Sequence, residues 1–136
     1  MSLTSIESLY DAFAKGDVPF VLGLLSPDIV WTAAENYPYA DRSPYVGPQE
    51  LLEGLFLRLA TEWDGFSATP QEHVAAGDTV VTFGRYQGVY TATGIHVDAQ
   101  FVHVWKFSDG KVKSFQQYCD TAQFRDAVTL VRPASV

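Results

Sequence analysis

The first half of the chain carries apolar residues at helical spacing, and the second half carries them at alternating positions. Apolar side chains three and four positions apart predict helices, because these positions share one face of an α-helix. We expect three helices in the first half: between Thr4 and Gly16, between Asp17 and Ser26, and from Pro48 to about Glu62.

Alternating apolar residues predict five strands, one before the third helix and four after it. The expected strands cover residues 29–35, 66–75, 79–90 and 95–107, followed by a return strand after Gly110. Pro70 suits an edge strand or a bulge, because proline cannot donate to the hydrogen-bond ladder of a central strand. A short helix from Thr121 to about Leu130 is expected to follow the last strand.

The stretch from Phe101 to Asp120 is predicted to form a long β-hairpin around the turn Ser108-Asp109-Gly110. Glycine there supplies the positive φ that a short hairpin needs. Alternation places His103 on one face with three aromatic residues: Phe101, Trp105 and Phe107. The return strand places three further side chains together on one side: Gln116, Tyr118 and Asp120. A histidine and a carboxylate framed by aromatic rings are typical of a small-molecule pocket.

Helices that are segregated from a run of strands indicate an α+β domain, with a curved sheet packed against the helices. The chain has 136 residues, which suits a single domain over residues 1–136. The net charge is −7, and nucleic-acid binding needs clustered Lys and Arg, so we expect no nucleic-acid partner.

Cys119 is the single cysteine, so neither an intrachain disulfide nor a cysteine-based metal site is expected. His96 and Asp98 fall on one face of a strand, but two ligands are too few for a metal ion, and we predict no metal. No apolar run is long enough to cross a membrane, and no secretory signal is apparent, so we expect a cytoplasmic protein.

The sequence resembles the SnoaL-like and ketosteroid-isomerase-related proteins of the nuclear transport factor 2-like superfamily. The resemblance covers nearly the whole chain, and these residues carry it: Val30-Trp31, Gly47-Pro48, Glu53-Gly-Leu-Phe56, Glu62-Trp63-Asp64, Thr93-Gly94, His103-Val-Trp105, Asp109-Gly-Lys111 and Gln117-Tyr-Cys-Asp-Thr-Ala122. It implies a cone, in which a curved, mainly antiparallel sheet wraps around helices and leaves an open pocket. The fold serves isomerases, cyclases, epoxide hydrolases, dehydratases and non-catalytic binders, so the resemblance does not fix an activity.

Three polar residues are the predicted catalytic groups: His103, Asp120 and Glu35. Asp120 resembles the acid/base aspartate of polyketide cyclases in position, and it could instead cap the helix that starts at Thr121. Glu35 lies near the place where ketosteroid isomerases carry their base, but no clear acid for the oxyanion hole stands on the fourth strand. Steroid isomerisation by that mechanism is therefore not expected.

His103 could abstract a proton, orient Asp120 or hydrogen-bond a ligand carbonyl, or it could be a purely structural histidine. Epoxide hydrolases of this fold use an arginine between two aspartates. Arg85, Asp98 and Asp120 fit that trio poorly, because Asp98 falls on the face away from His103.

Residues 36–47, here called the tyrosine loop, contain three tyrosines and two prolines and could cover a pocket or a subunit interface. Ten side chains are predicted to form the wall of the pocket: Trp31, Tyr37, Tyr39, Tyr45, Leu55, Leu59, Phe83, Phe101, Trp105 and Tyr118.

Together these features predict a small-molecule pocket, in an enzyme of isomerase or cyclase type that uses general acid/base chemistry on an apolar carbonyl compound without a cofactor. The alternative is a non-catalytic protein that binds an apolar ligand in the same pocket. A homodimer is also expected, because Val102 and Val104 face away from the pocket and no other element remains to cover them.

Overall fold

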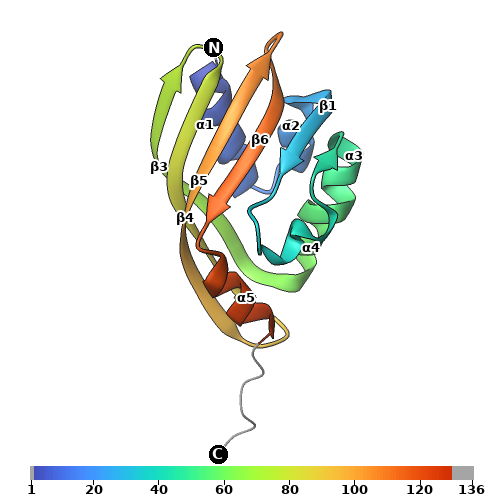
Figure 1. Ribbon diagram of the computed structural model, residues 1–136, viewed down its shortest axis with the longest axis vertical. Coiled ribbons are helices and arrows are strands. Elements are labelled where there is room, and N and C mark those ends of the chain that lie inside the picture. The colour runs from blue at the N-terminus through green and yellow to red at the C-terminus, as the bar shows by residue number, and fades with distance from the viewer. Residues whose placement is uncertain (1, 130–136) are drawn as a thin grey trace, which may run out of the picture.

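The computed structural model describes residues 2–129 as a curved six-stranded sheet that partly encloses its helices (Figure 1). The elements in chain order are α1 (Ser2–Ala14), α2 (Val18–Gly23), β1 (Leu25–Thr32), the 3₁₀ helix η1 (Pro38–Arg42), β2 (Tyr45–Val46), α3 (Pro48–Leu51), the π-helical turn η2 (Leu52–Phe56), α4 (Leu57–Glu62), β3 (Trp63–Ala76), β4 (Thr79–Tyr90), β5 (Ile95–Ser108), β6 (Lys111–Cys119) and α5 (Thr121–Thr129). This confirms the predicted α+β class.

The strands lie in the order β2-β1-β6-β5-β4-β3, and every neighbouring pair except β1 with β6 is antiparallel. In Figure 1, α1 and α2 lie behind the sheet, while α3 and α4 lie beside β1. We call the side of the sheet that packs against α1 its inner face and the other side its outer face. The predicted end of the last helix, Leu130, lies outside the described residues.

The turn between β5 and β6 has the predicted chemistry. Asp109 and Gly110 both have positive φ, 52° and 77°, and Ser108 pairs with Lys111 across the turn. Two consecutive residues with positive φ form the turn whose twist matches that of antiparallel strands. Pro70 also lies where expected, on the edge strand β3, beside a register shift between Pro70 and Glu72.

Residues 48–62 form one continuous helix in three parts, with the π-helical turn η2 in the middle. Gly54 of this turn lies against Tyr45, where a Cβ would come within 2.5 Å of the Tyr45 ring. The close approach needs a residue without a side chain. Several bounds differ from the prediction. The second helix ends at Gly23, β1 runs from Leu25 to Thr32, and β3 begins at Trp63. The tyrosine loop also contains η1 and the short strand β2.

The core fills the space between the inner face and the helices. Its largest fully buried side chains come from several elements: Trp105, Tyr39, Tyr45, Phe101, Phe124 and Ile6. Burying a side chain of this size stabilises the fold by about 1.5–3 kcal/mol. No helix within residues 2–129 is long and apolar enough to cross a membrane.

Candidate functional site

Three buried polar side chains lie in one row across the middle of the sheet. Thr82 on β4 pairs with His103 on β5, and His103 pairs with Gln117 on β6. Residues directly opposite each other point to the same face, so all three lie on the inner face. Their exposed fractions are 0%, 4% and 5%. Burying polar groups is unfavourable without hydrogen bonds, so a row of this kind calls for an explanation.

Two tyrosines bind the two ring nitrogens of His103. The Tyr10 hydroxyl, from α1, lies 2.5 Å from Nδ1, and the Tyr86 hydroxyl, from β4, lies 2.5 Å from Nε2. Trp105 Nε1 donates to the Tyr10 oxygen at 3.2 Å, and Gln117 Nε2 donates to the Tyr86 oxygen at 2.9 Å. The Gln117 carbonyl oxygen accepts from the backbone amide of Ala34 at 3.0 Å, which fixes the orientation of its side chain.

Burial keeps the three central groups uncharged. It holds the pKa of His103 well below its ordinary value, since burial penalises the imidazolium ion. It also raises the pKa of Tyr10 and of Tyr86 above the ordinary tyrosine value, since burial penalises the phenolate ion. At neutral pH the site therefore contains a neutral imidazole between two neutral phenols.

These three groups have more protons than their mutual hydrogen bonds can use. A neutral imidazole has one N–H, and each tyrosine has one O–H. Only two hydrogen bonds join them, so one tyrosine proton is left over. With the imidazole proton on Nε2, Tyr10 donates to His103 and Tyr86 accepts, which leaves the Tyr86 proton. With the proton on Nδ1, the roles reverse and the Tyr10 proton is left.

Tyr10, Tyr86, His103 and Gln117 line a cavity between the sheet and the helices. The space within it amounts to about 500 Å³ including the part open to solvent, and about 50 Å³ is wide enough for the centre of a water molecule. The other lining side chains described are apolar or aromatic: Leu9, Phe13, Val21, Trp31, Tyr37, Leu55, Phe56, Leu59, Phe66, Ala68 and Trp105. A largely apolar cavity with a few convergent polar groups is typical of a small-molecule site.

Six of the predicted site residues line this cavity: Trp31, Tyr37, Leu55, Leu59, His103 and Trp105. Phe101 is buried directly behind them, and its ring stacks on that of His103 with centroids 3.9 Å apart. Tyr39 and Tyr45 are buried within the tyrosine loop instead. Phe83 and Tyr118 lie on the outer face, 39% and 55% exposed.

The predicted pairing of His103 with Asp120 fails because of a bulge in the hairpin. A regular two-residue turn would put Gln116 opposite His103 and so align Tyr118 and Asp120 with it. A register shift between Lys106 and Phe107 instead puts Gln117 opposite His103. One extra residue exchanges the faces of all residues beyond it, so Gln117 and Cys119 point inward and Tyr118 points outward.

Asp120 and Glu35 lie away from the cavity. Asp120 lines a groove on the outer face with Phe83 and Tyr118, and its carboxylate accepts from the Gln123 side-chain amide at 2.9 Å. Glu35 follows the end of β1 and is exposed. The structure therefore brings His103 together with two tyrosines, Thr82 and Gln117, and with neither predicted carboxylate.

Sequence reasoning missed four residues of the site: Tyr10, Thr82, Tyr86 and Gln117. Thr82 and Tyr86 lie an even number of positions apart on β4, so alternation places both on one face, opposite to that of Phe83 and Arg85. The sequence could have indicated this. Tyr10 carries no such signal, because it reaches His103 from a helix 93 positions earlier in the chain.

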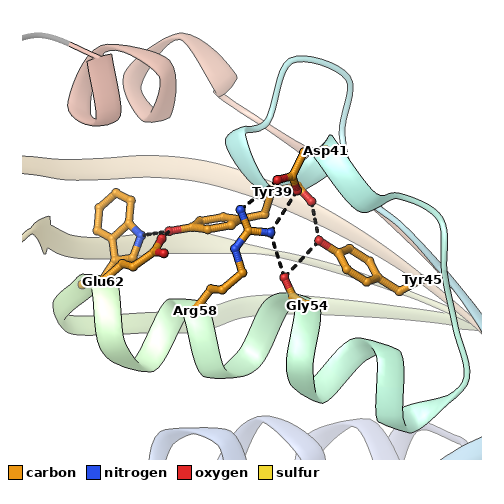
Figure 2. A network of polar contacts seen from close by, with 7 residues as sticks. Tyr39, Asp41, Tyr45, Gly54, Arg58 and Glu62 are labelled. Atoms are coloured by element: carbon orange, nitrogen blue, oxygen red, sulfur yellow. Dashed lines mark hydrogen bonds and ion pairs between the residues drawn. The ribbon is translucent and has the colours of Figure 1, made fainter.

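The tyrosine loop is fastened to α4 by a hydrogen-bonded network (Figure 2). Arg58 holds Asp41 through two bonds of 2.9 Å, and its guanidinium lies 4.6 Å from the centre of the Tyr39 ring. The Tyr39 hydroxyl donates to Glu62 at 2.5 Å and accepts from Trp63 Nε1 at 2.8 Å. Since Tyr37 of this loop lines the cavity, the network fixes one wall of the cavity.

The other candidate chemical groups of the sequence do not line the cavity. Arg85 Nε donates to Asp98 at 2.8 Å, and both side chains are more than 40% exposed. In the part of the chain that the structure describes, no group of three or more His, Cys, Asp or Glu residues is arranged to hold a metal ion. Burial raises the pKa of the Cys119 thiol to about 12, so this cysteine is not a reactive thiolate.

Comparison with known proteins gives a consistent picture. The family model described as the SnoaL-like domain matches residues 6–115. An NTF2-like protein from Burkholderia thailandensis is 31% identical, with 96% of this chain and 98% of that chain covered and a TM-score of 0.91. No curated protein gives a match.

Two further solved structures share the fold at lower identity. TerC, co-crystallised with polyporic acid, is 24% identical over 95% of this chain and 98% of its own, with a TM-score of 0.82. IdmH from Streptomyces antibioticus, a candidate polyketide cyclase, is 20% identical over 96% of this chain and 99% of its own, with a TM-score of 0.76.

Proposed function

Because the chain belongs to the SnoaL-like domain family of NTF2-like proteins, we propose that its cavity binds an apolar small molecule through a carbonyl or enol oxygen. The observation that carries the proposal is the left-over tyrosine proton beside His103. This proton has no acceptor among Tyr10, Tyr86 and His103, and an oxygen atom of the ligand would supply one. The apolar remainder of the cavity suits the rest of such a molecule.

The same donor would stabilise the negative charge of an enolate. A phenol already held by His103 and Gln117 needs little reorientation to meet a developing oxyanion, and preorganised donors of this kind contribute about 10²–10³ to a rate. Enolates are the intermediates of both isomerisation and ring closure. We therefore propose general acid chemistry of isomerase or cyclase type, with Tyr86 and Tyr10 as donors and no cofactor.

The cavity offers only a weak base, and this limits the class of substrate that the protein could convert. No described residue lining the cavity is an aspartate or a glutamate, and His103 binds a proton only well below its ordinary range. A weak base can remove a proton only from an acidic C–H group. Such a group lies next to a carbonyl whose enol form is well stabilised. The same facts support the alternative, a protein that holds such a ligand without converting it.

One experiment separates these possibilities. The apolar ketone 2-tetralone is added to the protein in D₂O, its binding is followed by the fluorescence of Trp31 and Trp105, and loss of its α-hydrogens is followed by proton NMR. The proposal expects binding, exchange faster than in buffer, and loss of both in Tyr86→Phe. Tyr118→Phe, on the outer face, is the matched control.

Binding without faster exchange would select the non-catalytic alternative. A ketone that neither binds nor exchanges, with the protein folded, would overturn the proposal. Equal exchange by the wild-type and Tyr86→Phe proteins would remove the role of the tyrosine.

We also propose a homodimer formed through the outer face. Val30, Phe83 and Tyr118 on this face are 38%, 39% and 55% exposed, which supports a second copy as their cover. Sedimentation equilibrium at micromolar concentration tests this, and a monomer there would contradict it.

A further inference from the structure

The polar row continues beyond the cavity to the edge of the sheet. His73 on the edge strand β3 pairs with Thr82, directly across from it, and its Nδ1 lies 2.8 Å from the Thr82 hydroxyl. On its other side, the Thr82 hydroxyl lies close enough to the Tyr10 hydroxyl to lower the pKa of Tyr10, against the larger effect of burial. Thr82 is completely buried, whereas His73 is half-buried and therefore reaches solvent. The ring centroids of His73 and Tyr10 are 5.7 Å apart.

We propose that His73 and Thr82 form the outer part of a proton path that runs through Tyr10 and His103 to Tyr86 and the ligand oxygen. This inference rests on the proposed function for its purpose, because the path would replace the proton that Tyr86 gives to a ligand. His73 does not touch the ligand in this scheme and acts through Thr82.

The path conserves protons at every step. A protonated His73 passes its Nδ1 proton to the Thr82 oxygen, and Thr82 passes its own proton to Tyr10. Tyr10 passes its proton to Nδ1 of His103, and His103 passes the proton on Nε2 to Tyr86, which gives its proton to the ligand enolate. Each intermediate group gives one proton and receives one, so the net change is one proton lost by His73 and one gained by the ligand.

In this scheme His103 relays a proton without becoming charged, which is compatible with its burial. In a concerted transfer His103 only changes from the Nε2–H form to the Nδ1–H form and does not become an imidazolium ion. Desolvation penalises the charged form of a histidine, and exchange between its two neutral forms creates no charge. The two tyrosine contacts, one on each ring nitrogen, are the arrangement that such an exchange requires.

The test measures how fast the ring N–H of His103 exchanges with water, without any ligand. Protein labelled with ¹⁵N-histidine is compared as wild type, Thr82→Val and Thr82→Ser, using saturation transfer from water. Valine keeps the shape of threonine and removes the hydroxyl, so exchange should slow by roughly tenfold or more, because only the narrow cavity and local opening of the structure remain as routes to water. Serine restores the hydroxyl and should restore the rate.

The backbone amides of Val102 and Val104, which flank His103, report local opening and should exchange equally in all three proteins. If Thr82→Val does not fold, His73→Phe interrupts the path at its outer end and should slow the ring exchange in the same way. Unchanged ring exchange in the folded variant, or ring and amide rates that change together, would overturn the path. Failure of 2-tetralone to bind would instead concern only the proposed function.

Discussion

The Tyr86 hydroxyl and Nε2 of His103 lie 2.5 Å apart in a buried site, and Gln117 holds the same hydroxyl from the next strand. Replacing Tyr86 by Phe would leave a buried imidazole nitrogen and a buried amide without this partner. We expect the free energy of unfolding to fall by about 1–3 kcal/mol, the usual cost of unsatisfied buried groups. Urea denaturation measures it, and Tyr118→Phe should change stability by much less.

The buried His103 makes stability depend on pH with a defined sign. Its pKa is lowered in the folded state, so the unfolded chain binds this proton more readily. The contribution of His103 to the free energy of unfolding is complete above its unfolded-state pKa of about 6.5. It is lost as the pH falls below that pKa, by up to about 1.4 kcal/mol per pH unit. His103→Gln should lack this loss between pH 7 and 5. Parallel stability curves for the two proteins would contradict this, because they would mean that the pKa of His103 is the same in the folded and the unfolded state.

The ion pair between Arg58 and Asp41 is expected to control the tyrosine loop more than the whole fold. Lysine cannot make both bonds to the carboxylate, so Arg58→Lys should speed amide exchange at Tyr39–Asp41. The pair is partly exposed, and global stability should change by less than about 1 kcal/mol. Lys113→Ala breaks an exposed pair with Asp28 and should leave the loop unaffected.

Gly54 and Gly23 form a matched pair of glycines. A Cβ at Gly54 would lie 2.5 Å from the Tyr45 ring, whereas one at Gly23 would have nothing within 4 Å. We expect Gly54→Ala to destabilise the protein by about 1–3 kcal/mol through overpacking. Gly23→Ala should be neutral or stabilising by up to about 1 kcal/mol. Thermal melting of both variants is the measurement, and equal effects would contradict the packing argument.

Local chemistry was readable from the sequence, and long-range geometry was not. The Asp109-Gly110 turn and the edge position of Pro70 follow from the backbone preferences of single residues, so they were predicted correctly. The bulge between His103 and the turn has no such signal, yet it decides that Gln117 and not Tyr118 faces the cavity.

The candidate site shows the same division. His103 and Trp105 were placed on the inner face by simple alternation, and they line the cavity. Tyr10 joins them only because the sheet curves around α1, which no local pattern encodes. Asp120 is predicted to act with His103 across the hairpin, but the register shift turns its side chain to the outer face, where it accepts from Gln123.

No residue separates α4 from β3: Glu62 ends the helix and Trp63 begins the strand. Leu59, one turn earlier, lines the cavity, and Trp63 is buried and bonded to Tyr39. The helix and the edge strand are therefore directly joined, with Leu59 at the cavity and β3 at the edge of the sheet. We expect a molecule that displaces Leu59 to displace the start of β3 as well, so amide exchange along β3 would report whether the cavity is occupied.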